Sequence, residues 1–146
     1  MRTSNYLILA AVVLATSACT NWSERITLPA NPDPVWRAEC SGCHTLYPPK
    51  LLTQSDWKAL MARLDKHFGV NASVDDKARE TITLALLQDA APDSSSGNHA
   101  DTLRITDTPW HRNRHAGTSI PVWRKNGADK PSNCNACHKN QDEQLW

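Results

Sequence analysis

The middle of the chain carries a stretch of apolar residues at helical spacing. The spacing of three and four residues predicts an amphipathic helix that begins after a Ser55 cap and stops at Gly69. Charged residues occupy the other face of this stretch. The apolar stripe consists of Trp57, Leu60, Met61, Leu64, His67 and Phe68. His67 lies on this stripe and not on the charged face.

Two further helices are predicted on either side of this one. Asp33-Pro34 is a helix-start signal, because proline suits the first helical position. After a Ser73 cap, residues 74–88 predict a helix with an apolar inner face made of Val74, Ala78, Ile82 and Leu86. The sequence shows no pattern that predicts parallel β-strands. The sequence therefore predicts a mainly α, loop-rich protein.

The pattern also divides the chain into segments. Residues 19–33 read as a polar tether, 34–90 as a first folded region, 91–101 as a linker rich in serine and aspartate, and 102–146 as a second region. The second region is too short to bury a core by itself. We therefore expect a bound group, as well as side chains, to fill the centre of the fold.

The first 18 residues have the layout of an export signal. Arg2 supplies a positive charge, an apolar run follows over residues 6–15, and small residues precede Cys19. Cys19 stands where a bacterial lipoprotein signal has its lipidated cysteine, although Thr16 replaces the leucine usual three positions earlier. We expect a periplasmic protein anchored to a membrane surface through a lipidated Cys19, without spanning the membrane.

Composition excludes one class of partner. Cleavage before Cys19 removes one of 16 basic residues and leaves 15 basic and 15 acidic ones. A chain without a basic surplus lacks the electrostatic footprint of a nucleic-acid-binding protein.

The pattern Cys-x-x-Cys-His occurs twice, as "ECSGCH" and "NCNACH". This pattern is the attachment signature of c-type haem, in which two cysteines form thioethers to the porphyrin and the adjacent histidine binds the iron. The motifs supply Cys40, Cys43 and His44 for a first haem, and Cys134, Cys137 and His138 for a second. The sequence thus predicts two covalently bound haem c groups.

Other uses of paired cysteines fit less well. A zinc ribbon needs its two pairs within about 20 residues, whereas these lie about 90 residues apart. Disulfides would not explain a histidine in the same position both times, and thioredoxin-like redox chemistry needs a βαβ context that this sequence lacks.

Each iron has a second axial position, and histidines are the available ligands. Met61 is the only methionine beyond the signal segment. His67 is favoured for the first haem, because a histidine on an apolar face suits a haem-filled core. For the second haem, "PWHRNRH" offers both His111 and His115, and this choice stays open. His99 lies in the polar linker and is expected to be exposed.

The segments "WRAECSGCHTLYPPKLL", "SDWKALMARLDKHFGVNAS", "RITDTPWHRNRH" and "NCNACH" resemble, in this order, the small bacterial dihaem cytochromes c. The resemblance implies helices packed around two bis-histidine haems, with His67 serving the first and His115 the second, in preference to His111, which stands where an aromatic residue is expected. It also implies a membrane cytochrome b or quinol-linked donor, and a soluble cytochrome acceptor that in some cases is an oxygen-binding monohaem cytochrome c.

Two haems with both axial positions filled leave no open metal site, so the expected function is single-electron transfer and no catalytic residue is expected. The alternative is a haem enzyme or gas sensor in which one iron has an open position, with peroxidase-like or ligand-binding activity. This alternative depends on the open choice between His111 and His115 as the second ligand of the second haem.

Overall fold

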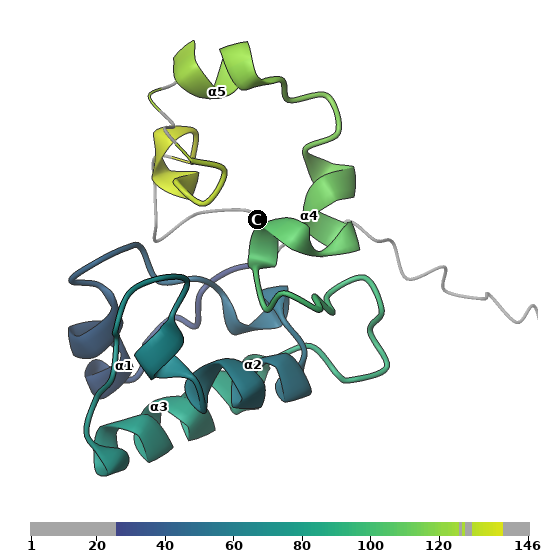
Figure 1. Cartoon of the computed structure of the whole chain (residues 1–146). Helices are drawn as coiled ribbons and strands as arrows, with labels where there is room; N and C mark the ends of the chain where they lie inside the picture. The colour runs from purple at the N-terminus through teal and green to yellow at the C-terminus, as the bar shows by residue number, and fades with distance from the viewer. Residues whose placement is uncertain (1–25, 126, 128–129, 139–146) are drawn as a thin grey trace, which may run out of the picture.

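The computed structural model describes residues 26–125, 127 and 130–138. In this part of the chain there are helices and turns and no β-strand, so the expected mainly α fold is confirmed. Figure 1 shows the helices in two groups, with α4 and α5 set apart from the other three. The α-helices are α1 (Pro34–Cys40), α2 (Gln54–Met61), α3 (Asp76–Asp89), α4 (Pro109–Arg114) and α5 (Ile120–Lys125).

Helix α1 begins as the sequence predicts. The Asp33 carboxylate accepts hydrogen bonds from the backbone N–H groups of Val35 and Trp36, at 2.8 and 3.1 Å. Pro34 occupies the first turn, where its missing N–H costs nothing. Cys40 is the last residue of the helix, so the first cysteine motif starts on a rigid element and continues into a turn.

Helix α2 is shorter than the apolar stripe suggests. Its N-cap is Thr53 and not the expected Ser55. The Thr53 hydroxyl accepts a hydrogen bond from the Asp56 N–H. It ends at Met61, whereas we expected it to reach Phe68. The chain then tightens into a 3-10 turn, and Phe68 and Gly69 adopt φ of 50° and 97°. Gly69 has the left-handed conformation expected of it, but the helix has already ended at Met61, so the predicted stop at Gly69 is wrong and His67 lies in a turn and not on the helix.

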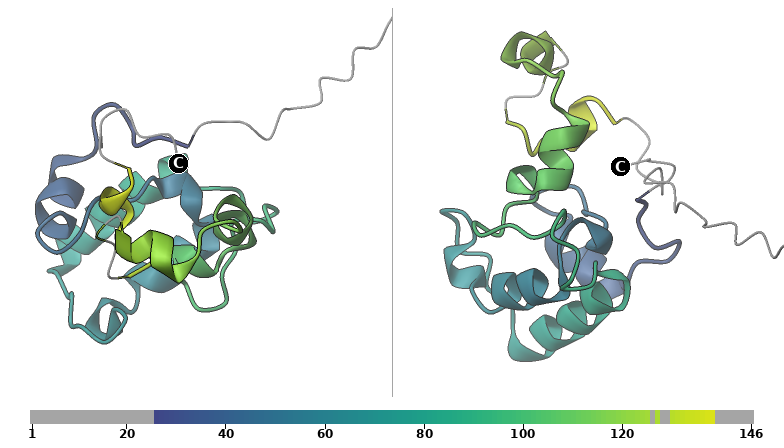
Figure 2. Two further views of the ribbon diagram at one scale, coloured as in Figure 1. Left: turned by 90° about the horizontal axis from the view of Figure 1, so that it is seen from above. Right: turned by 90° about the vertical axis from the view of Figure 1, so that its right-hand side faces the viewer.

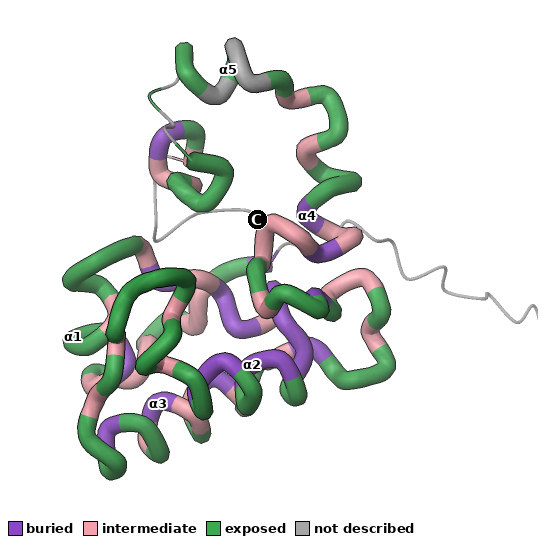
Figure 3. The backbone as a smooth tube through the Cα atoms, in the orientation of Figure 1, coloured by how far each residue is buried: buried purple, intermediate pink, exposed green. Residues whose placement is uncertain are grey.

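Helix α3 supplies much of the core. It starts after an Asp75 cap, two residues later than the expected Ser73 cap. Ala78, Ile82 and Leu86 are buried as predicted, and Val74 is packed at the edge of the same cluster. Figure 3 shows that burial is concentrated around α2 and α3. The core cluster consists of Trp36, Leu46, Leu52, Trp57, Leu60, Met61, Ile82, Leu86 and Ala100.

The second region stands to one side of this core. In the right-hand view of Figure 2, α4, α5 and the second cysteine motif extend away from the group formed by α1, α2 and α3. The side chains described there are mostly exposed, with Thr108, His111 and Ala136 as the buried exceptions. In the described part of the chain, no helix has the length and apolarity that crossing a bilayer requires.

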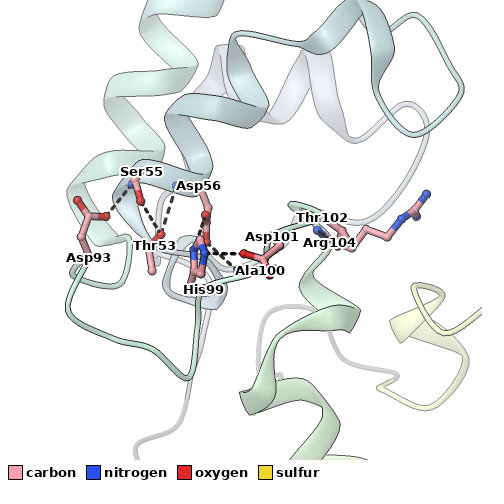
Figure 4. A network of polar contacts seen from close by, with 9 residues as sticks. All are labelled: Thr53, Ser55, Asp56, Asp93, His99, Ala100, Asp101, Thr102 and Arg104. Carbon is pink, nitrogen blue, oxygen red and sulfur yellow. Dashed lines mark hydrogen bonds and ion pairs between the residues drawn. The ribbon is translucent and has the colours of Figure 1, made fainter.

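The connecting segment 91–101 is fixed to the first region by hydrogen bonds (Figure 4). The Asp93 carboxylate accepts from the Ser55 N–H at 2.8 Å. The Asp56 carboxylate, 2% exposed, accepts from the Ala100 N–H at 3.2 Å and lies 2.9 Å from Nδ1 of His99. Composition alone indicated a flexible linker, but these contacts hold the start of the second region in place.

His99 provides a pH-sensitive part of this attachment. Its side chain is exposed, as expected, but the neighbouring carboxylate of Asp56, and then that of Asp101, raises its pKa above the ordinary 6.5. Asp93 also faces it. A raised pKa means that the folded state binds the proton more tightly than the unfolded state.

We expect the stabilisation from His99 to be complete below about pH 6.5 and to fade as the pH rises through the raised pKa. The measurement is the thermal unfolding midpoint of the haem-loaded protein across this pH range. In His99→Gln the decline should be smaller than in the wild type. An identical decline in both proteins would contradict the assignment.

Candidate haem-attachment sites

The first cysteine motif follows directly from the end of α1. Cys40 is half-buried and Cys43 is exposed in the turn. Burial, with smaller contributions from Glu39 and Cys43, raises the pKa of Cys40 to about 11.

His44 is oriented by two contacts. Its Nδ1 lies 2.6 Å from the Thr45 carbonyl oxygen, which can only accept, so Nδ1 carries the hydrogen. Its ring stacks on Tyr47, with centroids 4.9 Å apart and an interplanar angle of 23°. These contacts leave Nε2 unprotonated and hold the ring in one orientation, which is what a metal-binding histidine requires.

His67 faces His44 across the first site. The two ring centroids are 6.1 Å apart and the planes differ by 25°. Burial, followed by the nearby charges of His44 and Arg104, lowers the pKa of His67 and so favours the neutral ring that binds metals. Arg104 comes from beyond the connecting segment, and its guanidinium lies 4.3 Å from the centre of the Phe68 ring, next to His67.

The second motif lies in a short 3-10 turn, Cys134–Ala136. Burial raises the pKa of Cys134 to about 11, and Cys137 is exposed, so the pair of thiols resembles that of the first motif. His138 follows the turn, with its N–H donating to the Cys134 carbonyl at 2.8 Å. Burial, and then His115, lowers the pKa of His138.

Helix α4 presents two histidines to the second site in different ways. Thr108, fully buried, caps the helix by accepting from the His111 N–H at 3.0 Å. His111 is 8% exposed, and burial lowers its pKa to about 4. His115 follows the last helical residue, and its Nδ1 donates to the His111 carbonyl at 2.9 Å. In the neutral ring, this bond leaves Nε2 as the nitrogen that can bind a metal, as at His44.

The distances between ring centres identify one pair of histidines at each site that could share a metal. A histidine nitrogen binds a metal at about 2 Å, and the ring centre lies about one bond length further back, so two rings that share one metal have centres about 6 Å apart. The His115 and His138 rings are 6.4 Å apart, which fits, as does the 6.1 Å at the first site. The His111 and His115 rings are only 4.1 Å apart, so these two rings stack on one another and no metal fits between them.

Tyr47 connects the two sites, a role that was not predicted from the sequence. Its ring stacks on His44, and its hydroxyl donates to the Ser132 carbonyl at 2.9 Å. The Cys134 thiol lies 3.5 Å from the same carbonyl oxygen. Burial, and then Cys134, raises the pKa of Tyr47 to about 12. A lone tyrosine before two prolines shows no pattern that predicts such a long-range contact.

Comparison with known proteins shows what this chain is similar to. The family model for dihaem cytochrome c matches residues 36–146. Two solved structures from Rhodobacter sphaeroides are similar, DHC purified from that organism and a dihaem cytochrome c. Each is 39% identical to this chain. The match to the first covers 80% of this chain and 98% of the other, with a TM-score of 0.66. The match to the second covers 78% of this chain and 96% of the other, with a TM-score of 0.68.

A dihaem cytochrome c from Shewanella baltica OS155 is also similar, with 29% identity, coverage of 82% of this chain and 89% of its own, and a TM-score of 0.66. A comparison with curated proteins gives no match.

The hydrogen bond of Tyr47 should contribute measurably to stability. In Tyr47→Phe we expect the free energy of unfolding of the haem-loaded protein to fall by about 0.5–1 kcal/mol, the lower part of the usual range, because the bond is solvent-accessible. Tyr47→Leu also removes the stacking on His44 and should cost more. Denaturant unfolding measures both, and equal stability of wild type and Tyr47→Phe would contradict the link.

Proposed function

Since this chain belongs to the dihaem cytochrome c family and carries two covalently bound haem c groups, we propose that it transfers single electrons through two bis-histidine haems. His44 and His67 are the axial ligands of the first haem, and His138 and His115 those of the second. The spacing of the paired rings, 6.1 and 6.4 Å, supports this assignment most directly.

The haem irons supply the redox chemistry, alternating between the ferric and ferrous states. The chain's own residues make this a carrier and not a catalyst. With a histidine on each side, both axial positions are occupied, so substrates and gases have no metal position to bind. The hydrogen bonds from Nδ1 of His44 and His115 fix these rings before the metal is bound, so little movement accompanies a change of charge.

Contacts between the two regions support electron transfer inside the chain. Tyr47 touches a proposed ligand of the first haem with its ring and the second attachment motif with its hydroxyl. Arg104 approaches the first site from the second region. Because these contacts hold the two motifs side by side, an electron accepted at one haem can pass to the other without a change in the fold.

The location and partners proposed for the protein follow from its class and its first residues. Cytochromes c are typically exported, and residues 1–18 read as a signal that places the protein in the periplasm. Cys19, outside the described residues, would carry the lipid. We propose a membrane cytochrome b or quinol-linked donor, and a soluble cytochrome, in some cases an oxygen-binding monohaem protein, as acceptor.

Carbon monoxide distinguishes this carrier from a haem enzyme or gas sensor. The ferrous wild type should give no carbon monoxide spectrum, because both irons are closed. His67→Ala and His115→Ala should each open one haem, so that about half of the haem binds the gas. The measurement is the absorption difference spectrum, with the haem content of each protein determined separately.

His99→Ala is the matched control, since it removes a histidine that lies at neither site, and it should leave the protein unreactive. Carbon monoxide binding by half of the wild-type haem would contradict the closed carrier and favour the ligand-binding alternative.

The lipid anchor is tested by cell fractionation. In an export-competent bacterium, the full-length chain should be found in the membrane fraction and be released by detergent but not by high salt, because acyl chains hold it and not charge. Cys19→Ala should move the protein to the periplasmic fraction with its haem content unchanged. A wild-type protein found in the periplasmic fraction without detergent would contradict the anchor.

A further inference from the structure

The two candidate sites differ in the relative orientation of their histidine rings. At the first site, the planes of His44 and His67 are nearly parallel, with an angle of 25°. At the second, the planes of His115 and His138 are nearly perpendicular, with an angle of 75°. Two sites with the same kinds of ligand are therefore not equivalent in geometry.

His111 fixes the orientation of His115. The two rings stack with centroids 4.1 Å apart and planes within 22° of each other. The backbone carbonyl of His111 also accepts the hydrogen bond from Nδ1 of His115, at 2.9 Å. One residue thus holds both the face and the edge of the His115 ring, and rotation of that ring would break both contacts.

His111 is itself held firmly enough to serve this purpose. It is 8% exposed, its backbone N–H is bonded to the fully buried Thr108, and its side chain is hydrogen-bonded to the backbone of Thr106. A buried ring with bonds at both its backbone and its side chain has little freedom to turn. The orientation of His115 therefore follows from the start of α4.

We propose that His111 is a positioning residue that sets the ring of His115 nearly perpendicular to that of His138, and thereby makes the second haem electronically different from the first. This inference rests on the ligand pairs assigned above. It gives a role to the histidine that binds no metal: its ring is a platform for the ligand, close to the iron but outside its coordination shell.

Ring orientation has an electronic consequence. The π orbital of each imidazole mixes with the metal d orbital that lies across its plane. Parallel rings act on the same d orbital and separate its energy from that of its partner, whereas perpendicular rings act on different orbitals and leave the two nearly equal. In the ferric low-spin state this separation determines the g-values seen in electron paramagnetic resonance.

The first test is the electron paramagnetic resonance spectrum of the fully oxidised, haem-loaded wild type. We expect two low-spin signals of equal intensity: a rhombic one from the first haem, and one with a single large g-value from the second. Two rhombic signals would overturn the inference while leaving the ligand assignment intact. A high-spin signal would instead contradict the proposed ligands, so the two failures are distinguishable.

Variants at position 111 then test the role of the residue. His111→Leu introduces an apolar side chain of similar size that cannot stack as an aromatic ring does, so the large-g signal should shift or broaden while the rhombic signal is unchanged. His111→Phe retains an aromatic face and should keep the wild-type spectrum. His99→Leu is the matched control, because the same change is made at a histidine remote from both sites.

An unchanged large-g signal in His111→Leu would overturn the inference. Equal displacement of that signal in His111→Leu and His111→Phe would also overturn it, because the hydrogen bond to the Thr106 backbone, and not the stacked ring, would then be responsible. If the His111→Leu protein does not bind haem, the test is the comparison of wild type with His111→Phe. A displaced large-g signal in His111→Phe would then overturn the inference that the ring at position 111 positions His115.

Discussion

We propose that two histidine rings meet one metal from opposite sides at two places in this chain, and the arrangement of the chain follows from that requirement. In each pair, one histidine belongs to a cysteine motif and the other comes from a distant part of the sequence. The chain must therefore bring a turn after α2 against the end of α1, and the end of α4 against a 3-10 turn near residue 135. The observed ring spacings satisfy both requirements.

The first pair is supported by a conventional apolar core, and the second is not. Helices α1, α2 and α3 bury a cluster that includes Trp36, Trp57 and Ile82. Above it, α4 and the second motif bury few described side chains. Their position depends on the segment 91–101, tied to Asp56, and on the bond between Tyr47 and Ser132. In the holoprotein, the second haem supplies the apolar surface that this region lacks.

Local patterns predicted the parts of the site that are local. The four cysteines, His44 and His138 follow from the spacing of the motif, and the Asp33 cap follows from its neighbouring proline. His67 was selected as a candidate from a helical stripe, but it lies in a turn after the helix, because the chain breaks after Met61. The predicted helix was therefore too long, and the role of His67 as a ligand stays a prediction.

Contacts between distant segments could not be predicted in the same way. His111 and His115 differ by one helical turn in the same motif, and only the spacing of their rings supports the different roles that we propose for them. Tyr47 and Asp56 bridge segments more than 40 residues apart, and neither belongs to a recognisable pattern. The linker was predicted to be flexible from its composition. Composition contains no information about the groups that bond to the linker's backbone and side chains.

A crystal structure of the haem-loaded protein, at a resolution that distinguishes the axial nitrogen atoms, tests the central claim most directly. The account predicts one iron between Nε2 of His44 and a ring nitrogen of His67, and another between Nε2 of His115 and a ring nitrogen of His138, with His111 stacked beside the second. An iron with water at one axial position, or one bound by His111, would contradict it.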